Sequence, residues 1–177
     1  MNSKQNQKQT DECSVTVNLP YPPVRAESRS MEYATAMLSN VGSSNSEMSA
    51  VCLYFYNSVI LNPEYGDFAK CFHHISIVEM HHLDIFATLA YQMGMDPRMW
   101  CVERRGTTYW TPAYNRYPRS IKEVIENSLQ GELAAINKYE RQAETIRDAN
   151  IVENLHRIIL DERHHVEIFY DMLSKLS

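Results

Sequence analysis

The chain has 177 residues, of which 44% are hydrophobic and 22% are charged, a composition typical of one soluble globular domain. Its 22 acidic residues outnumber its 17 lysines and arginines, and the net charge of −5 argues against binding to nucleic acid or to an anionic membrane. Residues 1–15 lack the apolar run of a signal peptide, and no later stretch is long and apolar enough to span a membrane. We therefore predict a cytoplasmic protein without nucleic-acid or membrane partners.

The cysteines give a separate prediction about redox state. No two of them form the C-x-x-C pair that holds a zinc ribbon or a rubredoxin-type iron. We therefore expect isolated, reduced thiols at all four positions: Cys13, Cys52, Cys71 and Cys101.

Residues 1–28 are rich in polar side chains and then in proline, a composition that cannot offset the entropy of folding. We predict a flexible N-terminal arm here, either mobile or draped over the rest, and one helical bundle domain over 29–177. A short helix is expected at 31–40. After it, Ser44-x-x-Glu47 has the form of a capping box that opens a longer helix running to about Leu61.

The second half of the bundle follows a long connection. Apolar residues at helical spacing predict a second long helix from Phe68 to Met93, whereas 95–119 shows no sustained period. Two further helices are expected over 120–147 and about 151–176. Because adjacent antiparallel helices need only a short loop, the long connection predicts a crossover and an all-α, up-down-down-up four-helix bundle.

An internal repeat is the clearest feature of the sequence. The segment EMHHLDIF at 79–86 recurs as ERHHVEIF at 162–169, with five of the eight positions identical. A looser repeat links 46–51 with 131–136. The chain therefore reads as two copies of one helical hairpin.

Hairpin geometry sets the repeated glutamates at matching depths. The midpoint between Glu47 and Glu79 falls at Pro63, and the corresponding midpoint in the second hairpin falls at Arg147. Both midpoints lie at breaks between helices, so in each hairpin the two glutamates face each other. Their helical spacing also places them on the apolar stripes that form the core.

Four carboxylates in a core cost several kcal/mol each unless they are protonated, ion-paired or metal-bound. The stripes offer no Lys or Arg as partners, and exposed positions would not have apolar neighbours one turn away on either side. Two divalent ions balance four carboxylates and leave two neutral imidazoles as nitrogen donors. We therefore predict a site for two transition-metal ions, Fe or Mn, with six ligands: Glu47, Glu79, His82, Glu132, Glu162 and His165.

Three further side chains are candidates to support these ligands. Tyr54 and Tyr139 follow their glutamates by two helical turns, where a hydroxyl can reach a ligand carboxylate on a neighbouring helix; plain core packing is the alternative. Asp161 can accept a hydrogen bond from the non-ligating nitrogen of His82, and an exposed aspartate is the alternative.

At these residues the sequence resembles the ferritin-like superfamily of dinuclear metal carboxylate proteins, and within it the rubrerythrin and manganese catalase branch. The resemblance covers roughly 44–175. Rubrerythrins usually carry one more glutamate where this chain has Ala135, together with a rubredoxin module that this sequence lacks. The resemblance implies that Glu79 and Glu162 bridge two metals, completed by Glu47 with His82 and by Glu132 with His165.

The resemblance implies an oxidoreductase that decomposes or reduces hydrogen peroxide, catalase-like or peroxidase-like, with an unknown electron donor. The alternatives are a ferroxidase or iron-handling protein that uses dioxygen, and a coat or packing protein that retains the metal site. We expect a homo-oligomer in each case.

Without metal, the clustered glutamates should have raised pKa values, so the apo protein should gain stability on acidification, with the buried histidines opposing this in part.

Overall fold

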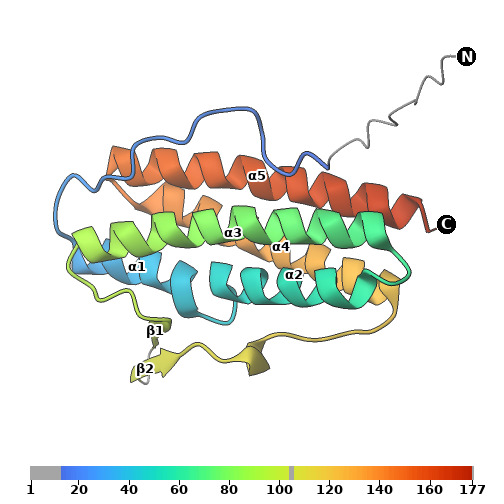
Figure 1. Cartoon of the computed structure of the whole chain (residues 1–177). Helices are drawn as coiled ribbons and strands as arrows, with labels where there is room; N and C mark the ends of the chain where they lie inside the picture. The colour runs from blue at the N-terminus through green and yellow to red at the C-terminus, as the bar shows by residue number, and fades with distance from the viewer. Residues whose placement is uncertain (1–12, 104–105, 177) are drawn as a thin grey trace, which may run out of the picture.

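Four long helices lie side by side as two antiparallel hairpins in the computed structural model, which describes residues 13–103 and 106–176 (Figure 1). The first hairpin joins α2 to α3, the second joins α4 to α5, and a shorter helix, α1, contacts α3. No described helix is long and apolar enough to cross a membrane. The helix bounds are Met31–Gly42 for α1, Glu47–Leu61 for α2, Gly66–Gln92 for α3, Ile121–Thr145 for α4 and Ala149–Ser174 for α5.

The connection between the two hairpins runs along the length of the bundle, so α4 begins at the same end of the bundle as α3 (Figure 1). The two helices are therefore parallel, and the predicted all-α, up-down-down-up order is confirmed.

Within this connection the structure forms a small hairpin that the sequence analysis did not predict. Strand β1 (Trp100–Glu103) pairs antiparallel with β2 (Gly106–Tyr109), and a short 3-10 turn, η1, follows at Pro112–Tyr114. Each strand has four residues, which is too short for an alternating pattern to stand out from the surrounding aromatics.

The helix starts of the second hairpin follow from their capping residues. The Ser120 side chain accepts a hydrogen bond from the backbone N–H of Glu123, and Asp148 caps α5 in the same way. The capping box predicted at Ser44 is wrong, because α2 begins at Glu47 with Ser46 as its N-cap. Glu47 is buried and faces the bundle interior, so it does not return to the cap.

A polar layer across the middle of the bundle divides the apolar core into two clusters. Large buried side chains on both sides of this layer hold the helices together through the hydrophobic effect. One cluster contains Phe86, Tyr139 and Ile158, and the other contains Phe72, Ile125 and Phe169.

Residues 13–28 lie on the bundle in extended conformation, along α5 (Figure 1). Arg157 of α5 donates to the backbone carbonyl oxygens of Val17 and Leu19 at 3.1 and 2.9 Å. This part of the predicted arm is therefore packed against the helices, while residues 1–12 lie outside the described residues. The domain boundary at residue 28 stays a prediction.

Cys13 at the start of this segment forms a disulfide with Cys71 of α3, and their Cα atoms are 5.6 Å apart. The prediction of reduced thiols is therefore wrong for this pair. The two cysteines are 58 residues apart in sequence, and only the path of the N-terminal segment along the bundle brings them together. Cys52 and Cys101 have no disulfide partner among the described residues.

Gly42 ends α1 where the helix meets β1. A Cβ at this position would lie 2.4 Å from the backbone nitrogen of Trp100 and 2.8 Å from the carbonyl carbon of Met99. Because backbone atoms cannot swing aside, we expect Gly42→Ala to lower the free energy of unfolding by about 1–3 kcal/mol. Gly66→Ala is the matched control, since its Cβ would meet nothing within 4 Å. Thermal melts check this, and equal melting temperatures for the two variants would contradict it.

Candidate metal centre

The polar layer is built from six side chains that the four long helices turn inward. One glutamate comes from α2 and one from α4, whereas α3 and α5 each supply a glutamate and, one turn later, a histidine. All six are at most 2% exposed. The structure thus brings together every residue predicted to be a metal ligand: Glu47, Glu132, Glu79 with His82, and Glu162 with His165.

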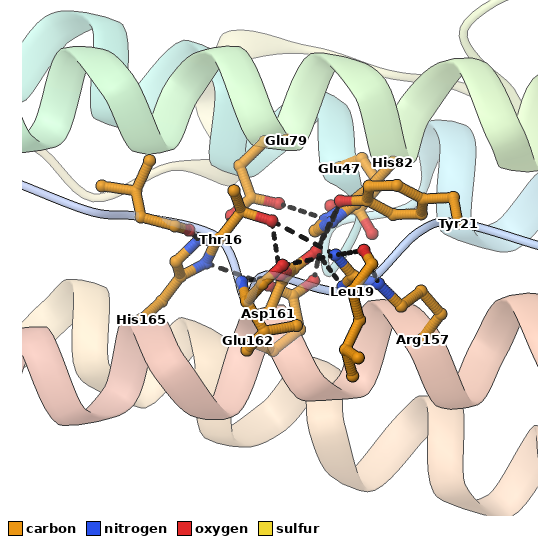
Figure 2. Close-up of polar contacts among 12 residues, drawn as sticks. Thr16, Leu19, Tyr21, Glu47, Glu79, His82, Arg157, Asp161, Glu162 and His165 are labelled. Atoms are coloured by element: carbon orange, nitrogen blue, oxygen red, sulfur yellow. Dashed lines mark hydrogen bonds and ion pairs between the residues drawn. The ribbon is translucent and has the colours of Figure 1, made fainter.

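The ligand atoms form two overlapping groups, and within each group they lie within 4.8 Å of one another. Glu79 and Glu162 belong to both groups, as expected of carboxylates that bridge two ions. Figure 2 shows Glu79 on α3 facing Glu162 on α5 across the space between the helices. The remaining members are Glu47 with His82 in one group and Glu132 with His165 in the other.

Each histidine turns its Nδ1 toward the shared carboxylates. In His165 this atom lies 3.0 Å from Glu79 Oε1 and 3.1 Å from Glu162 Oε2. Its other ring nitrogen, Nε2, lies 2.9 Å from the carbonyl oxygen of Val15. A carbonyl only accepts hydrogen bonds, so Nε2 carries a proton, and the ring offers a lone pair to the centre once Nδ1 has lost its own proton.

Several buried atoms of this layer have no hydrogen-bond partner in the described structure, namely Glu79 Oε1, both carboxylate oxygens of Glu162, and Nδ1 of His165. Buried polar atoms are normally paired, and an unpaired one costs about 1–3 kcal/mol. Carboxylate oxygens and imidazole nitrogens are donors that suit Fe and Mn. The side chains of this layer are therefore able to bind metal, and they fit two divalent ions.

Burial and crowding move the pKa values of these groups apart. Burial, reinforced by the charges of neighbouring glutamates, raises the pKa of Glu132 to about 8 and the pKa of Glu47 well above its usual range. Burial alone would raise the pKa of Glu79 and lower those of the histidines. Instead, the two histidines, whose Nδ1 atoms lie close to its carboxylate, hold the pKa of Glu79 low, while the surrounding carboxylates raise the pKa values of His82 and His165. Without metal, the layer therefore retains protons that bound ions would displace.

The geometry can now be compared with known proteins. The sequence model of the rubrerythrin family matches residues 42–173. The chain belongs to the rubrerythrin family. The predicted resemblance to this branch of the ferritin-like superfamily is thereby confirmed.

Several solved structures have a fold similar to that of this rubrerythrin-family chain. Two structures of KatB, a manganese catalase from Anabaena, match it with TM-scores of 0.79 and 0.77 at 20% and 21% identity, each over 90% of this chain and 79% of that one. A bacterioferritin from Rhodobacter capsulatus matches with a TM-score of 0.65 at 21% identity, over 81% of this chain and 82% of that one. At these identities the similarity establishes the ferritin-like fold. No curated protein sequence matches the chain significantly.

Two tyrosines of this family member brace the α2–α4 side of the centre. Tyr54 on α2 donates to Glu132 on α4, and Tyr139 on α4 donates to Glu47 on α2 at 2.5 Å. Burial, with the charge of the accepting glutamate, raises the pKa of each tyrosine well above its usual range, so each hydroxyl keeps its proton. Both predicted contacts to carboxylates of a neighbouring helix are therefore present.

The N-terminal segment supplies contacts that sequence reasoning missed. Asp161 accepts from His82 Nε2 at 3.3 Å, as predicted, and also from the hydroxyl of Tyr21 at 2.5 Å (Figure 2). Tyr21 also lies 3.2 Å from the same His82 nitrogen, while Arg157 pairs with Asp161 at 2.7 Å. The spacing of Arg157 and Asp161, one helical turn apart, was the only signal for this pair in the sequence. Nothing marked Tyr21 within a proline-rich stretch.

Asp161 ties the N-terminal segment to the histidine side of the centre. Burial would raise its pKa, but hydrogen bonds from His82, Tyr21, Val17 and Thr16 hold the pKa of Asp161 well below its usual range. An asparagine offers one acceptor oxygen instead of two and no charge. We expect Asp161→Asn to weaken metal binding by about 10–100-fold, as measured by metal titration of chelator-treated protein. Glu153→Gln, at an exposed position of α5, is the matched control, and equal affinities in the two variants would contradict this role.

The α2–α4 side of the centre borders a cavity of about 290 Å³. The segment Tyr114–Arg116 of the long connection also contributes to its lining. A molecule as small as hydrogen peroxide fits this space. The centre is thus covered by the N-terminal segment on its histidine side and borders a cavity on its other side, where the lining includes Glu47, Tyr54, Glu132 and Tyr139.

Proposed function

We propose that the protein is a dinuclear Fe or Mn oxidoreductase that decomposes or reduces hydrogen peroxide. The observation that carries this proposal is the pair of overlapping ligand groups, one glutamate of each group lining a cavity that suits a small molecule. Membership in the rubrerythrin family and structural similarity to a manganese catalase support it.

In this proposal Glu47 and His82 would hold one ion, Glu132 and His165 would hold the other, and Glu79 and Glu162 would contribute to both sites. When bound, the two ions supply two-electron redox chemistry with peroxide, by which two H₂O₂ become one O₂ and two H₂O.

The protein contributes positioning and proton handling. Glu47 and Glu132, which line the cavity, would hold the protons of peroxide. Tyr139 and Tyr54 fix the orientation of these two carboxylates by hydrogen bonding to them. The N-terminal segment keeps water from the opposite side of the centre.

Oxygen evolution tests the proposal. Mn-loaded or Fe-loaded protein should release one O₂ for every two peroxides consumed, and chelator-treated protein should release none, as followed with an oxygen electrode and a parallel peroxide assay. Peroxide consumption without O₂, dependent on an added reductant, would assign the peroxidase form of the activity. No consumption with either metal at full occupancy would overturn the proposal. Anomalous scattering on both sides of the Fe and Mn absorption edges would identify the metal.

Iron handling is the second candidate, because the fold is also similar to a bacterioferritin whose structure is described as having a dinuclear site. In that case Fe(II) would be oxidised by dioxygen, and storage would require a closed shell of many subunits. Light scattering of the native protein separates such a shell from the small homo-oligomer that we expect of a peroxide enzyme. A coat or packing role would instead show assembly that is unchanged in Glu47→Ala and Glu132→Ala.

A further inference from the structure

Residues 14–21, hereafter the strap, cover the histidine side of the centre. The Val15 carbonyl accepts from His165 Nε2 at 2.9 Å, and the Val17 N–H donates to Asp161 at 2.9 Å. At the far end of the strap, Tyr21 contacts His82 Nε2. The outward nitrogens of both predicted histidine ligands are therefore held by the strap (Figure 2).

Hydrogen bonds hold the strap more than burial does. Of residues 14–21, all of which the structure describes, only Val15 has a buried side chain. A segment with so little buried apolar surface belongs to the low-stability end of a protein and opens readily. Arg157 and Asp161 hold the middle of the strap by hydrogen bonds, and the way its ends are fixed adds to this hold.

The start of the strap is fixed covalently. The Cys13–Cys71 disulfide lies one residue before Ser14 and ties the segment to α3, two helical turns before Glu79. Cys13 and the buried Cys71 both line a cavity of about 560 Å³, which is large enough to admit a small thiol. Charges around this cavity occur as two ion pairs, Lys70 with Asp67 and Lys175 with Asp171.

We propose that the Cys13–Cys71 disulfide is a redox-active site that exchanges with thiol reductants and acts as a clasp for the strap. In the oxidised state the strap stays on α5 and orients both histidines. In the reduced state the strap opens more often, so that His165 loses the Val15 carbonyl that fixes its tautomer, while His82 loses Tyr21 and keeps Asp161. The proposal of a clasp is inferred from the disulfide and the strap contacts alone. Its effect on metal retention rests on the proposed function.

The exchange balances as ordinary thiol–disulfide chemistry. A thiolate of a dithiol attacks one sulfur, a mixed disulfide forms, and the other cysteine leaves as a thiolate. The second thiol of the reductant then releases the first cysteine, so the protein gains two electrons and two protons and the dithiol becomes a disulfide. Peroxide reverses this: H₂O₂ oxidises one cysteine thiol to a sulfenic acid with release of one water, and attack by the other cysteine thiol then forms the disulfide and releases a second water.

Closing by oxidation and opening by reduction would keep the strap over the metal centre when peroxide, the proposed substrate, is present. Peroxide re-forms the clasp, the strap covers the histidines, and the ions are retained. Reducing conditions open the clasp and let the ions exchange.

Hydrogen exchange of the full-length, metal-free protein tests the proposed clasp independently of metal binding. Reduction with dithiothreitol should raise the exchange rate of peptides from the strap by at least about tenfold, while peptides of α4 stay unchanged. The Cys13→Ser/Cys71→Ser double variant should exchange at the reduced rate in both conditions, and Cys52→Ser is the matched control that should behave like the wild type. Alkylation and mass measurement give the thiol state of each sample. Equal strap exchange in verified oxidised and reduced protein would overturn the clasp, as would free thiols at both positions after peroxide treatment.

Metal release tests the functional half of the inference. Loaded wild-type protein should lose Mn or Fe to an excess of chelator about tenfold faster when reduced, and the double variant should lose it at that faster rate in both states. Equal release rates together with faster strap exchange would overturn the link to metal retention. A failure to bind any metal would instead overturn the proposed function, and the exchange measurement would still decide the clasp.

Discussion

Glu79→Gln is expected to abolish binding of the two metal ions and to lower peroxide turnover by at least about a thousandfold. Glu79 belongs to both ligand groups, so its replacement by a neutral amide weakens both sites at once. In the proposed reaction the metal ions would supply several kcal/mol of transition-state stabilisation, and a loss of about 4 kcal/mol is a factor of about a thousand in rate.

Asp84→Asn provides the matched control for Glu79→Gln, because Asp84 is an exposed carboxylate five positions further along α3. Metal content by mass spectrometry and peroxide consumption are measured on both variants, with circular dichroism melts to show that each is folded. Retention of two ions by folded Glu79→Gln would contradict the bridging role of Glu79.

Metal-free protein is expected to be more stable at pH 5.5 than at pH 8. The pKa of Glu132 is raised to about 8, and that of Glu47 is also raised, whereas the unfolded value for glutamate is about 4.3. Between these limits the folded state binds more protons than the unfolded chain, so the free energy of unfolding rises as pH falls. Glu132 alone contributes on the order of 3 kcal/mol across this window.

The histidines act in the same direction. Their pKa values are raised in the folded state, so their contribution is fully present below the unfolded value of about 6.5 and is lost as pH rises through the folded value. The prediction that His82 and His165 partly oppose the trend is therefore wrong. It gave too much weight to burial and too little to the surrounding carboxylates.

Groups with lowered pKa values limit the range of this prediction. Glu79 and Asp161 stabilise the fold while they are ionised, and that contribution is lost only as pH falls below their unfolded values of about 4. Thermal melts of chelator-treated protein from pH 8 to pH 5 are the measurement. Metal-loaded protein is the control and should lose stability on acidification, because the ligands bind metal only when deprotonated. A melting temperature of the apo protein that fell steadily with acidification would contradict buried, mutually repelling carboxylates.

The clustering of the six candidate ligands could be predicted because its physics is local and repeated. A glutamate and a histidine one turn apart share a helix face, and equal distances from the hairpin turns put Glu47 opposite Glu79 and Glu132 opposite Glu162. The length of the connection likewise required a crossover. Each of these inferences uses only spacing along the chain, which the sequence contains in full.

The strap and the disulfide could not be predicted for the opposite reason. Residues 14–21 carry no periodic pattern, and their contacts with Asp161 and His165 join positions far apart in sequence. Their partners on α5 become visible only once the helices are assembled. The pairing of Cys13 with Cys71 depends on the same path of the segment over the bundle.

The division of ligands between the two hairpins has a consequence for how the protein folds. Each hairpin closes through a short turn and carries two glutamates and one histidine, so it can form from local contacts at little loop-closure cost. Each ligand group, however, also contains a glutamate from the other hairpin, which arrives only when the long crossover lets the two halves dock. Metal uptake in a refolding experiment should therefore follow the docking step, lagging behind the appearance of helical circular dichroism.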